Sequence, residues 1–278
     1  MPFRAALLQI TSSDNPRENL ALVCEMLREA RLGGADIALT PEVTNCVSNS
    51  RLQQDLVLET EVDDASLKVL QLLCKELNLW LIIGSLALKT NAADGRFANR
   101  SIVINNSGVV LARYDKIHMF DVNVTNEETY CESDGYRPGQ NAVVAETPFG
   151  RFGLSICYDV RFPYLYRALA MSGAEILTVP AAFSHVTGPA HWEVLVRSRA
   201  IENGCFVLAA AQTGQHKSIR GHDRRTHGHT MVVDPWGKVL VNAGKTVGVT
   251  LVDIDLALVN KARKMVPSLA HTQEFDGP

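Results

Sequence analysis

GLSICYDVRFP (residues 153–163) is a run of apolar residues that ends abruptly at Cys157. Tyr158, Asp159 and Arg161 follow directly, and a proline then begins a segment with a helical pattern. A thiol at the end of a buried strand, with charged side chains behind it and a helix start beyond, is a common setting for a nucleophile. We therefore predict that the rest of the fold brings other reactive groups to this sulfur.

Strand and helix patterns alternate along the whole chain. Apolar runs of strand length occupy residues 3–10, 35–42, 79–88, 174–180, 205–211 and 247–255. Helical patterns occupy 16–32, 66–77, 163–172 and 190–203, and a short helix starts at Leu256. Hairpins are expected at 90–114, 141–156 and 229–243, and polar loops at 43–60 and 115–142. The alternation favours an α/β layered domain with a mixed sheet, and two packed sheets with outer helices would fit the similar order of elements in the two halves.

No linker, low-complexity segment or fixed repeat divides the chain, so we expect one domain over residues 1–278. Its core would cover about 3–256, and an extended tail would begin at about 264. In layered α/β folds the working side chains lie on loops beyond the strand ends, and we expect the same here.

Composition and charge narrow the class of protein. The chain is 46% apolar and 21% charged, which is ordinary for a soluble globular protein, and its net charge of −3 suggests no surface for nucleic acid or an anionic membrane. No apolar stretch approaches the roughly 18 residues of a membrane span, and the N-terminus has the pattern of a strand, not of a signal peptide. The six cysteines form no C-x-x-C pair, which favours a cytosolic protein with reduced thiols. Cys24, Cys74 and Cys205 lie in apolar patterns typical of burial, whereas Cys46 and Cys131 have polar surroundings.

A thiol with a pKa of about 8.5 is mostly protonated at neutral pH, so Cys157 needs a base or a nearby cation. No histidine lies at a strand end near it, and the candidates are Glu42, at the end of the apolar run ALTPE, and Lys116, in RYDKIHMFD. Taken alone, Glu42 could equally be a solvated strand end or a helix cap, and Lys116 is more often a surface lysine. Only their combination with the cysteine favours a catalytic site.

The order PE, DKIH and ICYD-x-RFP, each at a strand end, resembles the nitrilase superfamily of carbon–nitrogen hydrolases over nearly the whole chain. The closer similarity is to its amidase branch, which contains ω-amidase and deaminated glutathione amidase. KIHMFDV (116–122), CESDGYRPG (131–139), TGPAHWEVLVRSRAIEN (187–203) and GHTMVVDPWGKVL (228–240) carry that match. The resemblance implies a four-layer α-β-β-α sandwich that pairs through its helical face into a homodimer or higher homo-oligomer.

The resemblance also implies roles for individual residues. Cys157 would be the nucleophile and Glu42 the general base, while Lys116 and the backbone N–H of Tyr158 would form the oxyanion hole. Glu132 would be a second glutamate that orients the lysine and contacts the substrate amide. Such a site hydrolyses an amide through a thioester and needs no cofactor and no metal, because every reacting group comes from the protein.

Spacing alone leaves Glu127, Glu128 and Glu132 open for that second acidic role. The Glu-Ser sequence followed by Pro-Gly, which matches the family pattern, selects Glu132.

Substrate contacts are harder to assign from sequence. Arg161 could hold a substrate carboxylate in bidentate fashion or form a salt bridge to Asp159 or Glu42 that shapes the pocket. Phe183 and Thr187 fall in a loop that lines the pocket in the amidase branch, and Thr187 is the candidate for a polar substrate contact. His191 and Trp192 are expected to pack the helix that starts there.

Residues 216–229, HKSIRGHDRRTHGH, hold four of the eight histidines. Their spacing matches neither a structural zinc pattern nor a helical H-E-x-x-H motif, and no cysteine lies nearby. We expect a mobile basic loop near the pocket mouth that helps to attract anionic substrates.

The leading functional hypothesis is a cysteine amidase that hydrolyses a small carboxylate-bearing amide, similar in substrate to deaminated glutathione amidase. An ω-amidase, an N-carbamoyl amino acid hydrolase and a nitrilase share the chemistry up to the thioester and stay open as alternatives. A non-catalytic scaffold with the same fold is the alternative from another class, although a scaffold has no need for Glu42, Lys116, Glu132 and Cys157 together.

Overall fold

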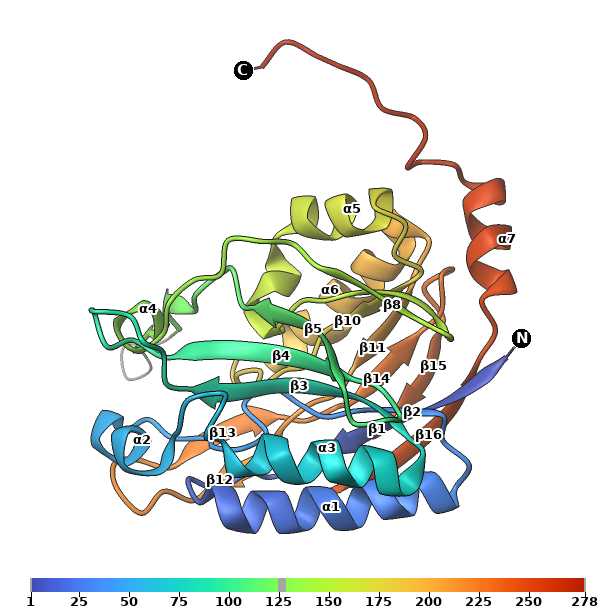
Figure 1. Cartoon of the computed structure of the whole chain (residues 1–278). Helices are drawn as coiled ribbons and strands as arrows, with labels where there is room; N and C mark the ends of the chain where they lie inside the picture. The colour runs from blue at the N-terminus through green and yellow to red at the C-terminus, as the bar shows by residue number, and fades with distance from the viewer. Residues whose placement is uncertain (1, 125–128, 278) are drawn as a thin grey trace.

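The computed structural model describes residues 2–124 and 129–277. Two six-stranded sheets lie face to face between pairs of helices (Figure 1). The first sheet has the order β16 (Gly248–Ile254), β1 (Phe3–Gln9), β2 (Ile37–Leu39), β3 (Trp80–Leu88), β4 (Ala98–Ile104), β5 (Val110–Asp115). The second has the order β15 (Val239–Asn242), β14 (Met231–Val233), β11 (Phe206–Ala209), β10 (Ile176–Thr178), β9 (Gly150–Gly153), β8 (Val144–Thr147). The expected mixed α/β architecture is confirmed, and its layers are consistent with an α-β-β-α sandwich.

Each sheet has a parallel centre and antiparallel edges. Strands β1, β2 and β3 run parallel, as do β9, β10 and β11, and antiparallel strands flank both sets. Parallel strands are buried on both faces, which explains their continuous apolar sequences. Along β1, Ala5 and Leu7 face the core between the sheets, whereas Ala6 and Leu8 face the core under the helices.

Helices cover the outer faces of the two sheets. Figure 1 shows α1 (Pro16–Leu32) and α3 (Ala65–Leu77) on one side, and α5 (Pro163–Met171) and α6 (Gly188–Asn203) on the other. Asp64 caps α3, because its side chain accepts from the backbone N–H of Leu67. Helix α7 (Ala257–Met265) follows the last strand, and the residues from 266 to 277 form neither helix nor strand.

The structure differs from the sequence prediction in three segments expected to be loops. Segment 43–60 contains helix α2 (Arg51–Val57), which Ser50 caps through a bond from the N–H of Gln53. Segment 115–142 contains β6 (Asp121–Asn123), β7 (Thr129–Cys131) and the single turn α4 (Glu132–Gly135). Segment 216–229 contributes to a two-stranded sheet of β12 (Thr213–His216) and β13 (Arg224–His227). These elements are short and polar, so they lack the apolar periodicity by which longer elements are recognised.

Most of the cysteines are buried, as the apolar patterns predict for Cys74 and Cys205. Cys24 is only half-buried, Cys46 is buried in spite of its polar sequence surroundings, and Cys131 is exposed. Burial raises the pKa of Cys46 and of Cys74 to about 12, so both thiols are unreactive at neutral pH. Within residues 2–124 and 129–277, none of the helices has the length and hydropathy that a membrane crossing requires.

Candidate active site

The nucleophile candidate sits on a tight turn at the end of a central strand. After β9 the chain enters a 3-10 helix, Cys157–Arg161, and Cys157 itself has a φ of 46°. A non-glycine residue rarely adopts this left-handed conformation, and such strain is concentrated at functional sites. The N–H of Cys157 donates to the carbonyl of Pro180 at 2.9 Å, and the Asp159 carboxylate accepts from the N–H of Ile156 at 2.9 Å. These bonds hold the thiol in place at the strand end.

Asp159 also joins this turn to the segment that carries Lys116. Its side chain is fully buried and accepts from the hydroxyl of Tyr114 at 2.6 Å and from the backbone N–H of His118 at 3.0 Å. The ring Nδ1 of His118 lies 2.6 Å from the same carboxylate. Because Tyr114 and His118 flank Lys116 in the chain, Asp159 fixes the lysine relative to the cysteine.

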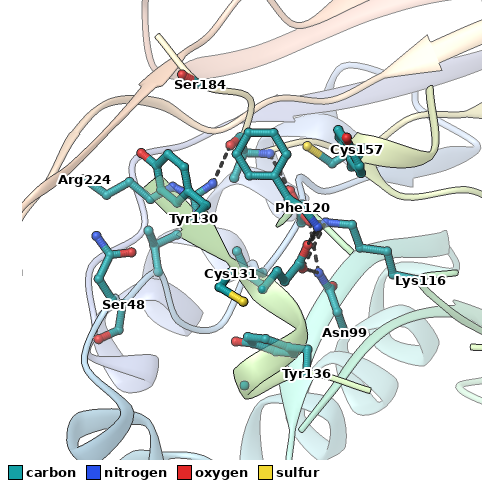
Figure 2. A pocket seen from close by; sticks show the side chains of 18 of the residues that line it. Ser48, Asn99, Lys116, Phe120, Tyr130, Cys131, Tyr136, Cys157, Ser184 and Arg224 are labelled. Atoms are coloured by element: carbon teal, nitrogen blue, oxygen red, sulfur yellow. Dashed lines mark hydrogen bonds and ion pairs between the residues drawn. The ribbon is translucent and has the colours of Figure 1, made fainter. Parts of the chain in front are cut away.

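Lys116 lies between two carboxylates in the interior. Its Nζ is 2.8 Å from Oε1 of Glu42 and 2.8 Å from Oε2 of Glu132, and Figure 2 shows Lys116 and Asn99 on the same side of the cavity as Cys157. The amide of Asn99 donates to Glu42 at 3.0 Å and to Glu132 at 3.3 Å. Glu42, Lys116 and Cys157 are only 3%, 2% and 8% exposed, so their charges interact in a medium that screens little.

The environment sets the protonation states of these groups. Burial opposes the charged form of Glu42, but the Lys116 cation and its hydrogen bond hold the carboxyl pKa below its ordinary value. Burial likewise opposes the charged form of Lys116, but the carboxylates of Glu132 and Glu42 raise its pKa. Burial and the charge of Glu42 raise the pKa of Cys157 well above its ordinary value, although Lys116 acts in the opposite direction. At rest the site therefore holds a neutral thiol beside an ionised carboxylate.

The sequence suggested Lys116 as a cation that activates the Cys157 thiol, and these pKa shifts show how far it does so. Lys116 does lower the thiol pKa, as expected, but burial and Glu42 outweigh it. A sulfur in this setting becomes nucleophilic by giving its proton to Glu42 during the attack. The carboxylate can receive that proton, because Glu42 lies close enough to Cys157 for its charge to raise the thiol pKa.

Two donors face the space beside the sulfur. The first is Lys116 Nζ. The second is the N–H of Tyr158, which is in the first turn of the 3-10 helix and has no intrahelical acceptor, whereas the N–H of Asp159 donates to Ile156. These are the two donors that the family resemblance assigns to an oxyanion hole.

A cavity of about 480 Å³ opens beside these groups, and Figure 2 shows the side chains around it. Phe183 and Thr187 line it, and the Thr187 hydroxyl is buried without a hydrogen-bond partner among the described residues. Arg161 is not among the residues that line the cavity. Its guanidinium packs against the rings of Tyr158 and Phe183 and lies 3.2 Å from Nδ1 of His191.

Neither salt bridge proposed for Arg161 is formed, because Asp159 pairs with Tyr114 and His118, and Glu42 pairs with Lys116. Trp192 packs against Phe183 in the buried core, as expected for the start of α6. Of the three acids considered for the second acidic role, Glu132 is the one beside Lys116, while Glu127 and Glu128 lie outside the described residues.

The histidines of 216–229 have structural partners. His216 is buried, donates from Nδ1 to the carbonyl of Ser12 at 2.8 Å and accepts from the Thr226 hydroxyl at 2.7 Å. Burial lowers the pKa of His216 and of His227 to about 4, so both are neutral at neutral pH. In the part of the chain that the structure describes, no group of three or more His, Cys, Asp or Glu side chains is arranged to hold a metal ion.

Sequence reasoning missed three groups at this site: the side chains of Asn99 and Arg224, and the backbone N–H of Ala182. Asn99 connects the two glutamates, the N–H of Ala182 donates to Oε2 of Glu42 at 2.8 Å, and Arg224 lines the cavity. Asn99 has no sequence signal beyond being a polar residue in an apolar strand. A backbone N–H leaves no signal in the sequence.

Comparisons of the sequence and of the fold found similar known proteins. A sequence model of the carbon-nitrogen hydrolase family matches residues 4–264. A deaminated glutathione amidase of Yersinia enterocolitica is 40% identical over 269 residues, covering 96% of this chain and 92% of the relative. One from Synechocystis sp. is 41% identical over 273 residues, covering 97% of this chain and 98% of the relative. The crystal structure of the Caenorhabditis elegans NitFhit protein aligns with a TM-score of 0.90 at 35% identity, and the alignment covers 98% of this chain and 65% of that one.

Proposed function

The chain belongs to the carbon-nitrogen hydrolase family, and from that premise we propose that it is an amidase with Cys157 as nucleophile and Glu42 as general base. It is a hydrolase of carbon–nitrogen bonds other than peptide bonds. The observation that carries the proposal is a buried Glu42 that pairs with Lys116 at 2.8 Å and whose charge acts on the Cys157 thiol.

The first half of the reaction forms a thioester. Glu42 takes the thiol proton as the sulfur of Cys157 attacks the amide carbonyl carbon. The carbonyl oxygen becomes an oxyanion that accepts hydrogen bonds from Lys116 Nζ and from the N–H of Tyr158. The tetrahedral intermediate collapses, the carbon–nitrogen bond breaks, and Glu42 returns its proton to the leaving nitrogen.

The second half releases the acid by the same route. Glu42 removes a proton from water, and the resulting hydroxide attacks the thioester carbonyl. The carbon–sulfur bond breaks, the sulfur regains a proton from Glu42, and the carboxylic acid leaves. Glu132 holds Lys116 in position throughout, because both of its carboxylate oxygens lie within 2.9 Å of the lysine nitrogen.

The substrate class follows from the relatives, which are named deaminated glutathione amidase. We propose an amide of a small carboxylate-bearing acid, with deaminated glutathione as the first compound to test. Thr187 and Phe183 line the cavity and are proposed to contact it, and a cavity of about 480 Å³ is in the usual range for a small-molecule site. Cytoplasmic location and a homodimer or larger homo-oligomer are further proposals, carried by the family resemblance alone.

The test is product formation from a panel of amides with wild-type protein, Cys157→Ala and a matched control. Cys131→Ala is the control, because Cys131 also lines the cavity but is exposed, and its sulfur contacts the Ser133 hydroxyl. The panel contains deaminated glutathione, read by release of cysteinylglycine, and 2-oxoglutaramate and glutamine, read by ammonia. An N-carbamoyl amino acid and a simple nitrile complete it.

We expect turnover of deaminated glutathione by the wild type and by Cys131→Ala, and none by Cys157→Ala. Turnover confined to the carbamoyl compound or to the nitrile would replace the substrate assignment with one of those activities. Activity retained in Cys157→Ala would falsify the nucleophile.

A further inference from the structure

Arg224 is a pocket cation that the proposed mechanism does not use. Two arginines line the cavity, Arg51 and Arg224. The side chain of Arg51 is fully engaged, because it bonds to the carbonyls of Gly95 and Gly135 and pairs with Asp55. Among the described residues Arg224 makes one hydrogen bond, from Nη2 to the carbonyl of Ala182 at 2.8 Å, and it lies 5.7 Å from the centre of the Tyr130 ring.

The rest of the Arg224 guanidinium is short of acceptors. Its Nε is buried and has no hydrogen-bond partner among residues 2–124 and 129–277, and no carboxylate in these ranges lies within ion-pair distance. Arg224 lines the cavity all the same, so its charge meets whatever occupies that space. The guanidinium fork matches a carboxylate, which makes an anionic ligand group its natural partner.

Backbone pairing holds this arginine at the cavity. Strand β13 is linked to the loop after β10 by a bridge between Ser184 and Thr226 and by a bond from the N–H of His227 to the carbonyl of Phe183 at 2.9 Å. Arg224 and Arg225 point to opposite faces of the strand. Arg225 is exposed and contacts Gln215, so only Arg224 is presented to the cavity.

The position of Arg224 relative to Glu42 indicates which part of the substrate it meets. Ala182 accepts from Arg224 through its carbonyl and donates through its N–H to Oε2 of Glu42. Glu42 is the group that returns a proton to the leaving nitrogen in the proposed mechanism. Figure 2 shows Arg224 beside Tyr130, on the side of the cavity away from Cys157. The amine half of a bound amide therefore extends past Glu42 toward Arg224.

We propose that Arg224 forms a leaving-group subsite for a carboxylate on the amine half of the substrate. Deaminated glutathione carries such a carboxylate on its leaving dipeptide, so it can test this contact. The inference rests on the proposed amidase function, because the role of Glu42 decides that Arg224 meets the amine half of the substrate and not the acyl half. Arg161, which packs behind Tyr158 and Phe183, is separate from this subsite.

The kinetic test compares two amides with one enzyme. The first is deaminated glutathione, whose leaving dipeptide ends in a carboxylate, and the second is its analogue ending in a carboxamide. The readout is the ratio of the two kcat/KM values, because any effect of Arg224 on the charge of Glu42 acts on both substrates and cancels. The variant is Arg224→Gln, which keeps a donor for the Ala182 carbonyl, and Arg225→Gln is the matched control.

We expect the ratio to fall about 10- to 100-fold in Arg224→Gln, the usual loss for a hydrogen bond to a charged group, and to stay within about twofold in Arg225→Gln. Arg224→Met replaces the glutamine variant if that protein does not fold. An unchanged ratio in a folded Arg224 variant overturns the subsite, even if both rates decrease together.

A binding measurement separates failure of the subsite from failure of the proposed function. Calorimetry with the product cysteinylglycine requires no turnover. Tighter binding to wild type and Arg225→Gln than to Arg224→Gln supports the subsite even if the chain hydrolyses none of the amides. Equal binding to all three proteins, or no binding to the wild type, counts against it.

Discussion

Glu42→Gln should separate the reactivity of the sulfur from the hydrolysis of amides. Oε1 of Glu42 accepts from Lys116 and Asn99, and Oε2 accepts from the N–H of Ala182. A glutamine amide has one oxygen, so in either orientation it turns an N–H group toward a donor. We expect the lost hydrogen bond to lower the free energy of unfolding by about 1–3 kcal/mol, which leaves a typical domain folded.

Turnover should fall much further than stability. A positioned general base contributes about 10²- to 10⁴-fold to the rate, which is about 3–5 kcal/mol of the barrier. The thiol should respond in the opposite direction. The charge of Glu42 is one cause of the raised pKa of Cys157, and Lys116 opposes it, so removing that charge lowers the thiol pKa.

The assay pairs amide hydrolysis with iodoacetamide labelling of Cys157, followed by mass spectrometry across a pH series. Glu132→Gln is the control, because Glu132 pairs with the same Lys116 but is not among the main causes of the raised thiol pKa. We expect the labelling midpoint to move to lower pH in Glu42→Gln and to stay near the wild-type value in Glu132→Gln. A midpoint that moves to higher pH in Glu42→Gln, or hydrolysis within about tenfold of wild type, would refute the reasoning.

Two further predictions follow from the buried charges. The pKa of Glu42 is held below its ordinary value of 4.5, so kcat/KM should stay level on acidification to about pH 5 and fall only below pH 4.5. The stability that this carboxylate contributes should be lost over the same range. A fall in kcat/KM centred between about pH 5 and pH 7 would contradict the prediction. Asp159→Ala leaves the Tyr114 hydroxyl and the N–H groups of Ile156 and His118 buried without their acceptor, so urea unfolding should show a loss of about 3 kcal/mol or more, and a loss below about 1 kcal/mol would show that the network is dispensable.

Local apolar patterns in the sequence were sufficient to predict the main strands and helices. The continuous apolar runs of β1 and β3 and the amphipathic faces of α1 and α3 predict their own structures, because burial on two faces or on one imposes those patterns. The family motifs placed Glu42, Lys116, Glu132 and Cys157 at the ends of elements, and the structure brings all four together. Elements such as α2, β12 and β13 could not be predicted in this way, because their stability comes from caps and pairing with distant segments.

The tertiary structure alone decided the electrostatics of the site. The sequence shows a lysine that can activate a thiol, but only the burial of Cys157 against Glu42 makes the resting thiol neutral. The sequence presents Arg224 and Arg225 as two adjacent basic residues. Strand β13 pairs with the loop after β10, and its side chains alternate between the two faces, so Arg224 lines the cavity and Arg225 lies on the surface. A sequence determines which side chains are available and which segments are apolar, whereas charge states and contacts depend on how distant segments meet, because desolvation and Coulomb energies are set by three-dimensional distance.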